Sequence, residues 1–418
     1  MKFNIDILSR KFFIALAISL IAIPFARFVS PKTVIDGAGV YLAWLPLSAS
    51  FAVMLIFGRH GLLPLIISFW LLNNYIVNLT LFQATVLLFC QMLGVVVACA
   101  MLRWQIGRRW RCGMPNHHLG IAVFWIGFFA PALMKSVMYL IGDEMDFPVN
   151  VSSYFGTSSL VYGVVDVQSL ICASLIFTPL FYYPIRMILN YRYAVAFWHR
   201  HVLSLWTAKN RTFVFYWLLG LVTLLIILCS PFEAEYIAGY LVPIIFILFF
   251  AGISRMSGVL IVLIWSVSAF LLVLNNKHFL FGVLSAYSVA FVLSVLISFT
   301  ICILYMALIY SRGEALKRKW HDRALIDPLT GLPNLREFEL YLKEHERATV
   351  CCLRIDNLEF LSRHYGMMMR IYCKRIITRN LQPLLGHDEK LFQIPGNELL
   401  LVLTGPETEA RLTHIVKF

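Results

Sequence analysis

The stretch 327–334, Asp327-Pro-Leu-Thr-Gly-Leu-Pro-Asn334, divides the chain into two parts of different composition. Before it the residues form an almost unbroken series of apolar segments, and after it the composition is that of a soluble protein. Inside it, Pro328 and Pro333 fix φ, and Gly331 permits a positive φ. Asn334 belongs to the residue types that cap helices, so we expect a turn followed by a helix over 334–345.

The part before this stretch has the composition of a membrane protein. The whole chain is 60% hydrophobic and 14% charged, whereas soluble proteins average about 45–50% and about 25%. Several segments approach the roughly 20 apolar residues that cross a bilayer, which predicts a mainly α fold, a polytopic helical bundle of about ten transmembrane helices. The expected spans are 12–28, 39–58, 61–76, 84–102, 119–141, 158–184, 212–230, 236–253, 258–274 and 285–310.

The distribution of basic residues predicts the orientation of these spans. With the N-terminus in the cytoplasm and the spans alternating, the outer loops hold only Arg27, Lys32 and Lys277 among the lysines and arginines. All the other basic residues before the last span fall in cytoplasmic segments or inside spans, as the positive-inside rule requires. We therefore expect both termini in the cytoplasm and the lipid bilayer as partner. This topology accounts for the net charge of +13, so we expect no nucleic-acid partner.

Two ionisable residues, Lys135 and Asp166, fall inside the fifth and sixth spans. Each lies about seven or eight residues from the outer loop that joins these spans, so a rise of about 1.5 Å per residue brings them to similar depth. We expect them to pair within the membrane. Such a pair can be purely structural, or it can mark a ligand or proton site.

Other polar and breaking residues in the spans have simpler interpretations. Interhelical hydrogen bonds account for the polar residues Asn73, Asn74, Gln83, Gln91 and Gln168 without any ligand. The prolines Pro46, Pro64, Pro131 and Pro179 predict kinks or interruptions of their helices. The chain has nine cysteines, none in a paired C-x-x-C spacing, so we expect neither a zinc nor a redox motif.

The part after the last span alternates helices and strands. A helical linker over 311–326 continues the last span, and it can either transmit a rearrangement or act as a spacer. Beyond it the pattern predicts a helix over 334–345, a strand over 349–356 and a helix over 357–383. A hairpin follows, with strands 390–394 and 399–404 around a turn at 395–398. This alternation predicts an α/β or α+β domain.

The opening stretch resembles the D-x-L-T-x-L-x-N start of the GGDEF domain of cyclic di-GMP signalling proteins. The hairpin Pro395-Gly396-Asn397-Glu398-Leu399 lies where the family has Gly-Gly-Asp-Glu-Phe. Leu353-Arg354-Ile355-Asp356 resembles the family's metal-binding strand. The preceding spans resemble the membrane-associated sensor domain often fused to such outputs, through Trp44-Leu45-Pro46 and Asp166. The resemblance to GGDEF covers 327–418, about the first half of such a domain.

The departures from the family pattern imply a degenerate domain. The family's first metal-binding Asp falls at Arg354, and its signature Asp falls at Asn397, which leaves only Glu398. Pro395 replaces a glycine and lacks a donor N–H. A cyclase needs hard carboxylate oxygens to hold Mg²⁺. We therefore expect no catalytic residue, no metal site and no bound Mg²⁺ or GTP in this chain.

We predict a transmembrane sensor domain over 1–310, a linker helix over 311–326 and a truncated, degenerate GGDEF-like domain over 327–418. The resemblance implies the sensor and regulatory portion of a bacterial inner-membrane cyclic di-GMP phosphodiesterase whose EAL domain is missing here. The alternatives are a diguanylate cyclase, or a transporter-like membrane protein with a vestigial tail. Enzymatic activity, the sensed ligand or membrane partner, and a homodimer remain open at this point.

Overall fold

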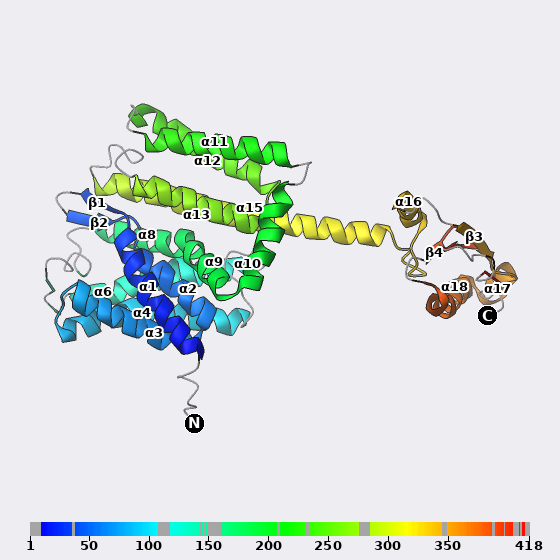
Figure 1. Ribbon diagram of the computed structural model, residues 1–418, viewed down its shortest axis with the longest axis horizontal. Coiled ribbons are helices and arrows are strands. Elements are labelled where there is room, and N and C mark those ends of the chain that lie inside the picture. Colours follow the sequence, from blue (N-terminus) through cyan, green and yellow to red (C-terminus); the bar gives the residue numbers. More distant parts are fainter. Residues whose placement is uncertain are drawn as a thin grey trace, which may run out of the picture. The chain divides into compact units, whose positions relative to one another are not determined.

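The structure is a computed structural model, and it describes part of the chain. The described residues are 10–35, 38–107, 118–142, 144–145, 147–148, 155, 160–206, 210–230, 234–275, 285–344, 349–386, 389–396, 398–403, 409 and 412–413. The chain divides into two compact units, residues 1–311 and residues 312–418 (Figure 1). Each unit is described by itself below.

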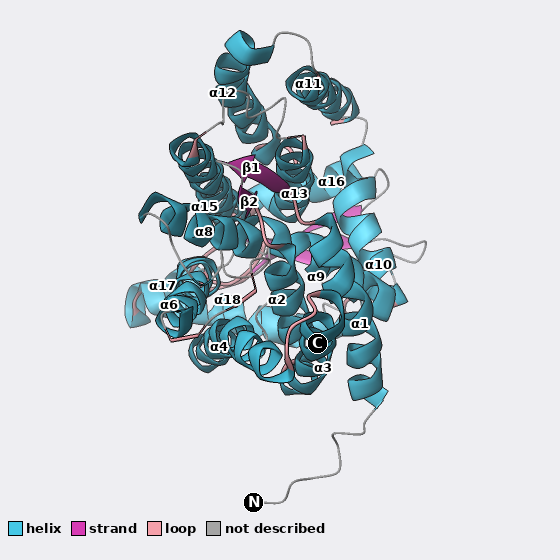
Figure 2. Cartoon of the chain, turned by 90° about the vertical axis from the view of Figure 1, so that its left-hand side faces the viewer, coloured by secondary structure: helices cyan, strands magenta, loops and turns pink. Residues whose placement is uncertain are grey.

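The first unit is a bundle of apolar helices. Its helices are α1 (Arg10–Val29), α2 (Leu45–Phe57), α3 (Arg59–Leu71), α4 (Leu81–Ile106), α5 (Leu119–Ala122), α6 (Ala130–Gly142), α8 (Leu160–Cys172), α9 (Thr178–Leu189), α10 (Tyr191–Phe197), α11 (Arg211–Cys229), α12 (Ala234–Ile253), α13 (Gly258–Leu274) and α15 (Ala286–Ala324). The last of these runs on into the second unit. The prediction of a mainly helical fold is confirmed (Figure 2).

Six stretches of described helix are long and apolar enough to cross a membrane: Arg10–Val29, Leu81–Ile106, Leu119–Gly142, Val161–Leu189, Arg211–Cys229 and Ala286–His321. Three shorter apolar helices, Leu45–Phe57, Leu241–Ile253 and Gly258–Leu274, lie below that length. By length and composition the described residues contain six candidate spans, and the expected count of about ten stays a prediction.

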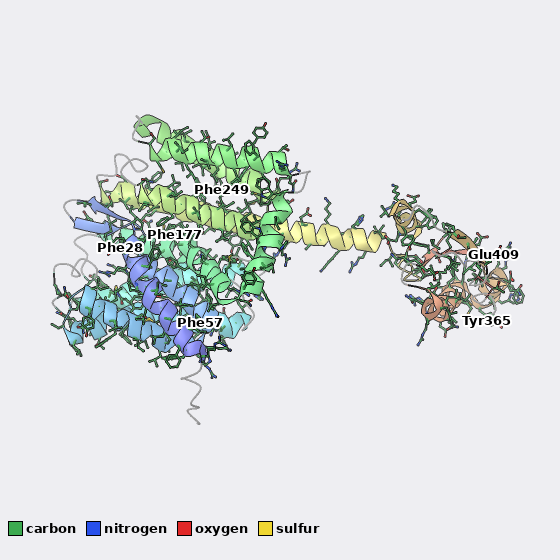
Figure 3. All side chains as sticks on the ribbon, in the orientation of Figure 1. Phe28, Phe57, Phe177, Phe249, Tyr365 and Glu409 are labelled. Carbon is green, nitrogen blue, oxygen red and sulfur yellow. The ribbon has the colours of Figure 1, made fainter. Side chains whose placement is uncertain are left out.

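Aromatic side chains fill the interior of the bundle. Phe177 and Phe249 are fully buried (Figure 3), and the ring of Phe249 packs edge-on against Trp265 with 5.1 Å between the centroids. The Trp265 indole donates a hydrogen bond to the Thr300 hydroxyl at 2.8 Å. The one polar atom of this cluster is therefore satisfied, and α13 is fixed against α15.

The described residues of this unit include four wide π turns. The turns are η2 (Leu72–Ile76), η3 (Val123–Phe129), η4 (Ala173–Phe177) and η5 (Trp198–Val202). Pro131 follows η3 within two residues, and Pro179 follows η4 within two residues. A proline removes a backbone donor and crowds the preceding turn. A wide turn just before it therefore gives the interruption that was predicted for Pro131 and Pro179. Pro46 instead lies in the first turn of α2, and Pro64 lies inside α3, which continues past it.

A short hairpin that the sequence analysis did not anticipate connects α1 to α2. Its strands are β1 (Lys32–Ile35) and β2 (Ala38–Tyr41), paired antiparallel with Lys32 opposite Tyr41. The Lys32 ammonium lies over the Tyr41 ring at 4.6 Å. Beyond β2 the backbone N–H of Leu42 donates to the Pro31 carbonyl at 3.0 Å. The hairpin thereby fixes the residues that lead into α2.

The second unit begins with the C-terminal end of α15 and the turn 327–334. The Asp327 carboxylate accepts hydrogen bonds from the backbone N–H of Thr330 at 3.1 Å and from its hydroxyl at 2.5 Å. Gly331 has φ of +76°. The Asn334 side chain accepts from the backbone N–H groups of Arg336 and Glu337 at 3.0 and 3.3 Å. It therefore caps α16 (Leu335–Glu344), as its residue type predicted.

The rest of this unit is a three-stranded sheet with two helices. The strands β3 (Thr349–Arg354), β4 (Lys390–Gln393) and β5 (Glu398–Leu403) are all antiparallel, in the order β3-β5-β4. Leu399, Leu401 and Leu403 of β5 are buried on one face, and Val402 packs with Phe392 on the other. This alternation is the period of two that a strand with both faces covered shows.

The single helix expected over 357–383 is wrong. The structure has α17 (Leu358–Tyr365) and α18 (Met367–Leu381), which Gly366 separates with φ of +85°. A residue in that conformation cannot continue a right-handed helix. Tyr365-Gly366 is therefore a helix boundary.

Candidate functional site

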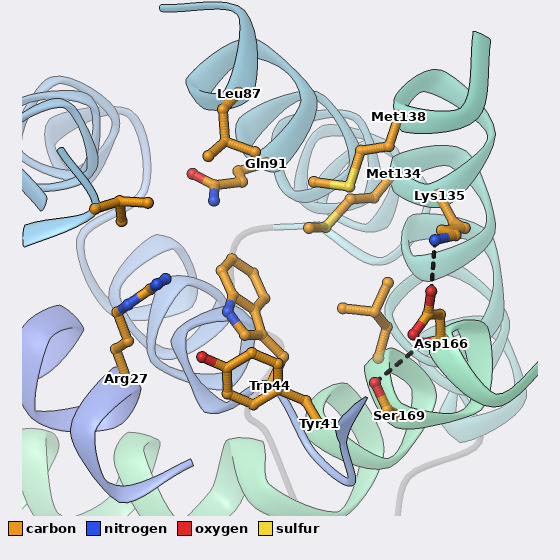
Figure 4. Close-up of a pocket in the computed structure, with 12 residues that line it drawn as sticks. Arg27, Tyr41, Trp44, Leu87, Gln91, Met134, Lys135, Met138, Asp166 and Ser169 are labelled. Carbon is orange, nitrogen blue, oxygen red and sulfur yellow. Dashed lines mark hydrogen bonds and ion pairs between the residues drawn. The ribbon is translucent and has the colours of Figure 1, made fainter. Parts of the chain in front are cut away.

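A cavity of about 50 Å³ lies within the first unit, among α1, β2, α2, α4, α6 and α8. Figure 4 shows the residues around it. It is lined by Arg27, Tyr41, Trp44, Val77, Leu87, Gln91, Met134, Lys135, Met138, Asp166, Ser169 and Leu170. Most of the lining is apolar, with a few charged and amide groups. Ligand sites in proteins have this character.

Lys135 and Asp166 meet at one wall of the cavity. The Lys135 ammonium of α6 lies 2.6 Å from an Asp166 carboxylate oxygen of α8, and the two side chains are 9% and 23% exposed. The Ser169 hydroxyl donates to the backbone carbonyl of Asp166 at 3.0 Å, one turn along α8. The structure thus brings together the two ionisable residues that the sequence placed at similar depth.

Arg27 approaches the cavity from α1, on the side opposite Lys135 (Figure 4). Its side chain is half-buried, and within the described part of the chain its guanidinium makes no hydrogen bond or ion pair. The sequence analysis placed it in an outer loop, next to the end of the first span. In the structure α1 extends to Val29, so the last turn of this helix carries Arg27 to the cavity.

Gln91 reaches the cavity from α4 and is fixed by Asn73. The Asn73 amide nitrogen donates to the Gln91 carbonyl oxygen at 3.2 Å and to the Ala84 backbone carbonyl at 3.5 Å. The amide nitrogen of Gln91 then points into the cavity (Figure 4). Both residues are buried. The interhelical hydrogen bond expected for them is present, and it also orients a donor toward the cavity.

The remaining walls are apolar. Trp44 lies at the N-terminus of α2, and its ring packs against Phe69 with 6.1 Å between the centroids. Met134 and Met138 come from α6, and Leu87 comes from α4. Thioether side chains adapt their shape to what they contact. The cavity therefore combines two cations and one carboxylate with a hydrophobic wall, an arrangement suited to binding a small charged molecule.

The hairpin residues of the second unit are only partly described. Pro395 and Gly396 lie in the turn between β4 and β5, where Gly396 has φ of +103°. Glu398 and Leu399 begin β5. Asn397 lies outside the described residues. Arg354 ends β3 directly opposite Glu398 in the strand register, so a cation stands beside the one carboxylate left at this position.

A buried lysine, which the sequence analysis missed, holds this turn. The Lys374 ammonium of α18 donates to the Gln393 side chain at 3.2 Å and to the backbone carbonyls of Gly396 and Glu398 at 2.8 and 3.4 Å. Burial lowers the pKa of Lys374, and the charge of Arg370 adds to the effect. Lys374 lies in the basic sequence 370–379, which resembles a solvated helix face, so no sequence signal distinguished it.

The described residues contain no group of three histidines, cysteines or acidic residues that could hold a metal ion. The cysteines that are described are free thiols.

Comparison with known proteins decides the family. The model of the MASE1 family matches residues 14–314. The chain belongs to the MASE1 family. The match covers the apolar helices of the first unit, so the MASE1 region is the membrane sensor region of this chain. Every residue that lines the cavity falls within it.

Two curated proteins of Escherichia coli K12 extend the similarity beyond the MASE1 region. The chain is 45% identical over 405 residues to the probable cyclic di-GMP phosphodiesterase PdeA, a match covering 97% of the chain and 56% of PdeA. It is 24% identical over 401 residues to the cyclic di-GMP phosphodiesterase PdeF, covering 94% of the chain and 53% of PdeF. The chain thus spans a little more than half the length of these relatives. No solved structure matches it.

Proposed function

We propose that this chain is the sensor and regulatory portion of a cyclic di-GMP phosphodiesterase of the bacterial inner membrane. The observation that carries the proposal is the 45% identity to PdeA along 97% of the chain. The similarity continues past the MASE1 region, which ends at residue 314, into the second unit. In this proposal hydrolysis belongs to an EAL domain in the part of such proteins that the match does not cover.

Residues 327–418 of the second unit are in this proposal a degenerate GGDEF-like domain that regulates and does not catalyse. The register of β3 and β5 supports this, because Arg354 stands opposite Glu398. A guanidinium there would repel Mg²⁺, and it stands in place of an acidic ligand, which leaves Glu398 as the carboxylate of this pair of positions. The linker over 311–326 lies in α15 as far as Ala324, and this helix runs without interruption from Ala286. A continuous helix can pass a rotation from the sensor region to the output.

The proposed topology has about ten spans with both termini in the cytoplasm. Beside the six long helices, the proposal counts the shorter helices α2, α3, α12 and α13 as spans, which gives ten. Reporter fusions test this. Green fluorescent protein fused after residue 418 should fluoresce, and alkaline phosphatase fused after Gly142, at the end of α6, should be active. The reverse pattern contradicts the topology.

A chimera tests the regulatory function. The matched part of PdeA is replaced with this chain, and hydrolysis of cyclic di-GMP is measured in membranes. We expect hydrolysis, and we expect Asp166→Asn to change the rate per molecule of chimera, so the rate is normalised to the amount of chimera in the membranes. Glu144→Gln, an exposed acidic residue just beyond α6, is the matched control. A chimera whose rate is indifferent to Asp166 speaks against a sensor role for the cavity region.

Purified chain tested alone with GTP and Mg²⁺ addresses the cyclase alternative. We expect no cyclic di-GMP, and its formation refutes the regulatory assignment. The transporter alternative is favoured by one observation, a buried ion pair beside a cavity within apolar helices. Reconstituted vesicles should show no flux that depends on Lys135 and Asp166. The sensor could also work as a homodimer, which crosslinking in membranes tests.

A further inference from the structure

Among the described residues, the charges of the side chains that line the cavity of the MASE1 region do not balance. Lys135 and Asp166 neutralise each other through their contact at 2.6 Å. Arg27 then adds a further positive charge, and within the described part of the chain its guanidinium has neither a hydrogen-bond nor an ion-pair partner. An arginine between apolar helices is costly without a counter-charge. The cavity therefore favours a ligand that carries one negative charge.

The donors at the cavity suit a carboxylate. The guanidinium of Arg27 presents a planar fork of N–H groups, which matches the two oxygens of a carboxylate. The amide nitrogen of Gln91 points into the same space from α4 (Figure 4), and Asn73 holds the other end of that amide. A phosphate dianion fits less well, because its second charge has no cation to meet and Asp166 would repel it.

The volume and the walls limit the rest of the ligand. A cavity of about 50 Å³ has room for roughly three to five water-sized groups. Trp44, Leu87 and Met134 offer mostly apolar surface, and the volume is too small for a sugar or a nucleotide. The body of the ligand should accordingly be a short alkyl chain.

We propose that the cavity binds a short-chain monocarboxylate, with its carboxylate on Arg27 and Gln91 and its alkyl group against Trp44, Leu87 and Met134. The proposal names the ligand class of the sensor region, and its biological meaning rests on the proposed sensing function. A ligand in the cavity contacts residues of α1 and α4 and lies beside the ion pair that joins α6 to α8. Occupancy of the cavity can therefore alter how these helices pack.

The test is calorimetric titration of the purified full chain in detergent with sodium propionate, which has five non-hydrogen atoms. Propionamide, which has the same size without the charge, is the matched ligand control, and sodium chloride and sodium phosphate are run at equal ionic strength. We expect saturable propionate binding with a dissociation constant between micromolar and millimolar, as befits so small a ligand. Propionamide, chloride and phosphate should not bind.

The variants separate the site from the general charge of the protein. Arg27→Gln should weaken propionate binding by roughly tenfold or more. Arg10→Gln, on the exposed first residue of the same helix, should leave it unchanged. Arg27→Lys keeps the charge without the fork and should bind with intermediate affinity, so the proposal stays testable if Arg27→Gln does not fold.

Three results overturn the proposal: propionamide or phosphate binding as well as propionate, unchanged affinity in Arg27→Gln, or no saturation below about 50 mM propionate. These results are independent of the chimera experiment. Propionate can bind while the chimera fails, which refutes the proposed output and leaves the site intact. The chimera can respond to Asp166 while propionate fails, which refutes only the ligand class.

Discussion

Replacing Asp166 with asparagine should destabilise the MASE1 region by about 3 kcal/mol. The Lys135 and Asp166 charges are 2.6 Å apart, and at an effective dielectric constant of about 20 their attraction is about 6 kcal/mol. Asparagine keeps the shape of the aspartate and removes its charge, so the Lys135 ammonium stays buried without a counter-charge from residue 166. Removing one partner of a buried ion pair lowers the free energy of unfolding by about 3–5 kcal/mol. The low end applies because the Asp166 side chain is 23% exposed and the adjoining cavity can admit water.

A double-mutant cycle separates the pair from its surroundings. Lys135→Met with Asp166→Asn leaves no unpaired charge, so the double variant should lie within about 1 kcal/mol of the wild type. Stability is measured by titrating purified protein in mixed micelles with sodium dodecyl sulfate and following helicity by circular dichroism. Glu144→Gln, which removes an exposed carboxylate near the same helix, should unfold like the wild type.

Two results would refute this reasoning. The first is a double variant as unstable as the sum of the single variants, which means that the two charges do not interact. The second comes from charge reversal: if Lys135→Asp with Asp166→Lys is no more stable than either single reversal, the attraction between the two charges does not hold α6 against α8.

Three further perturbations follow from the structure. Gly58→Ala should cost about 2 kcal/mol, because Gly58 has φ of +63° and an added Cβ would meet the Arg103 guanidinium; unfolding in mixed micelles measures it. Lys374→Met should destabilise the second unit by about 2 kcal/mol, because it leaves the hydrogen-bond acceptors of the turn 393–398 without this donor. Limited proteolysis should cleave this turn faster in Lys374→Met than in Lys343→Met, which changes an exposed lysine. Equal cleavage rates in the two variants would contradict the prediction. His201 donates to or accepts from Ser257 at 2.7 Å, and burial with the charge of Arg200 lowers its pKa below the usual 6.5. Between that lowered value and 6.5 the unfolded chain binds more protons, so stability is complete above pH 6.5 and falls as the pH drops through the window. The melting temperature should therefore fall from pH 7 to about pH 5 more in the wild type than in His201→Gln, and parallel curves would refute this role.

The parts of the fold that follow from local composition could be predicted from the sequence. Long apolar runs predict membrane helices. The stretch 327–334 predicted its turn and the Asn334 cap, because its prolines, glycine and asparagine have narrow conformational preferences. The pairing of Lys135 with Asp166 could be predicted from their depth in the membrane alone. Both residues lie a similar number of helical residues from the loop that joins their spans.

The rest of the candidate site depends on tertiary packing. Arg27 lies near the end of α1, and the last turn of this helix could not be located from the sequence. A helix that ended one turn earlier would leave Arg27 in the outer loop, away from the cavity. Gln91 is oriented by Asn73, a residue of η2, and no periodicity predicts a π turn. Lys374 could not be told from its basic neighbours in the sequence. Two of its acceptors are backbone carbonyls, and every residue type has a backbone carbonyl. Gly366 could have been found, since a glycine within a long helical pattern is a common boundary.

The π turn η4 joins α8 to α9, and it has a consequence for how this pair of helices tolerates insertions and deletions. A π turn holds one residue more than an α-helix needs, and each helical residue rotates the chain by about 100°. Asp166 precedes η4 and meets Lys135, whereas Tyr183 follows it and packs against Phe197 with 5.6 Å between the ring centroids. Deleting one residue from 173–177 would give a regular helix and turn one of these two contacts away from its partner. The number of residues between Asp166 and Tyr183 should therefore be fixed, and a change in length there should cost more than a conservative substitution.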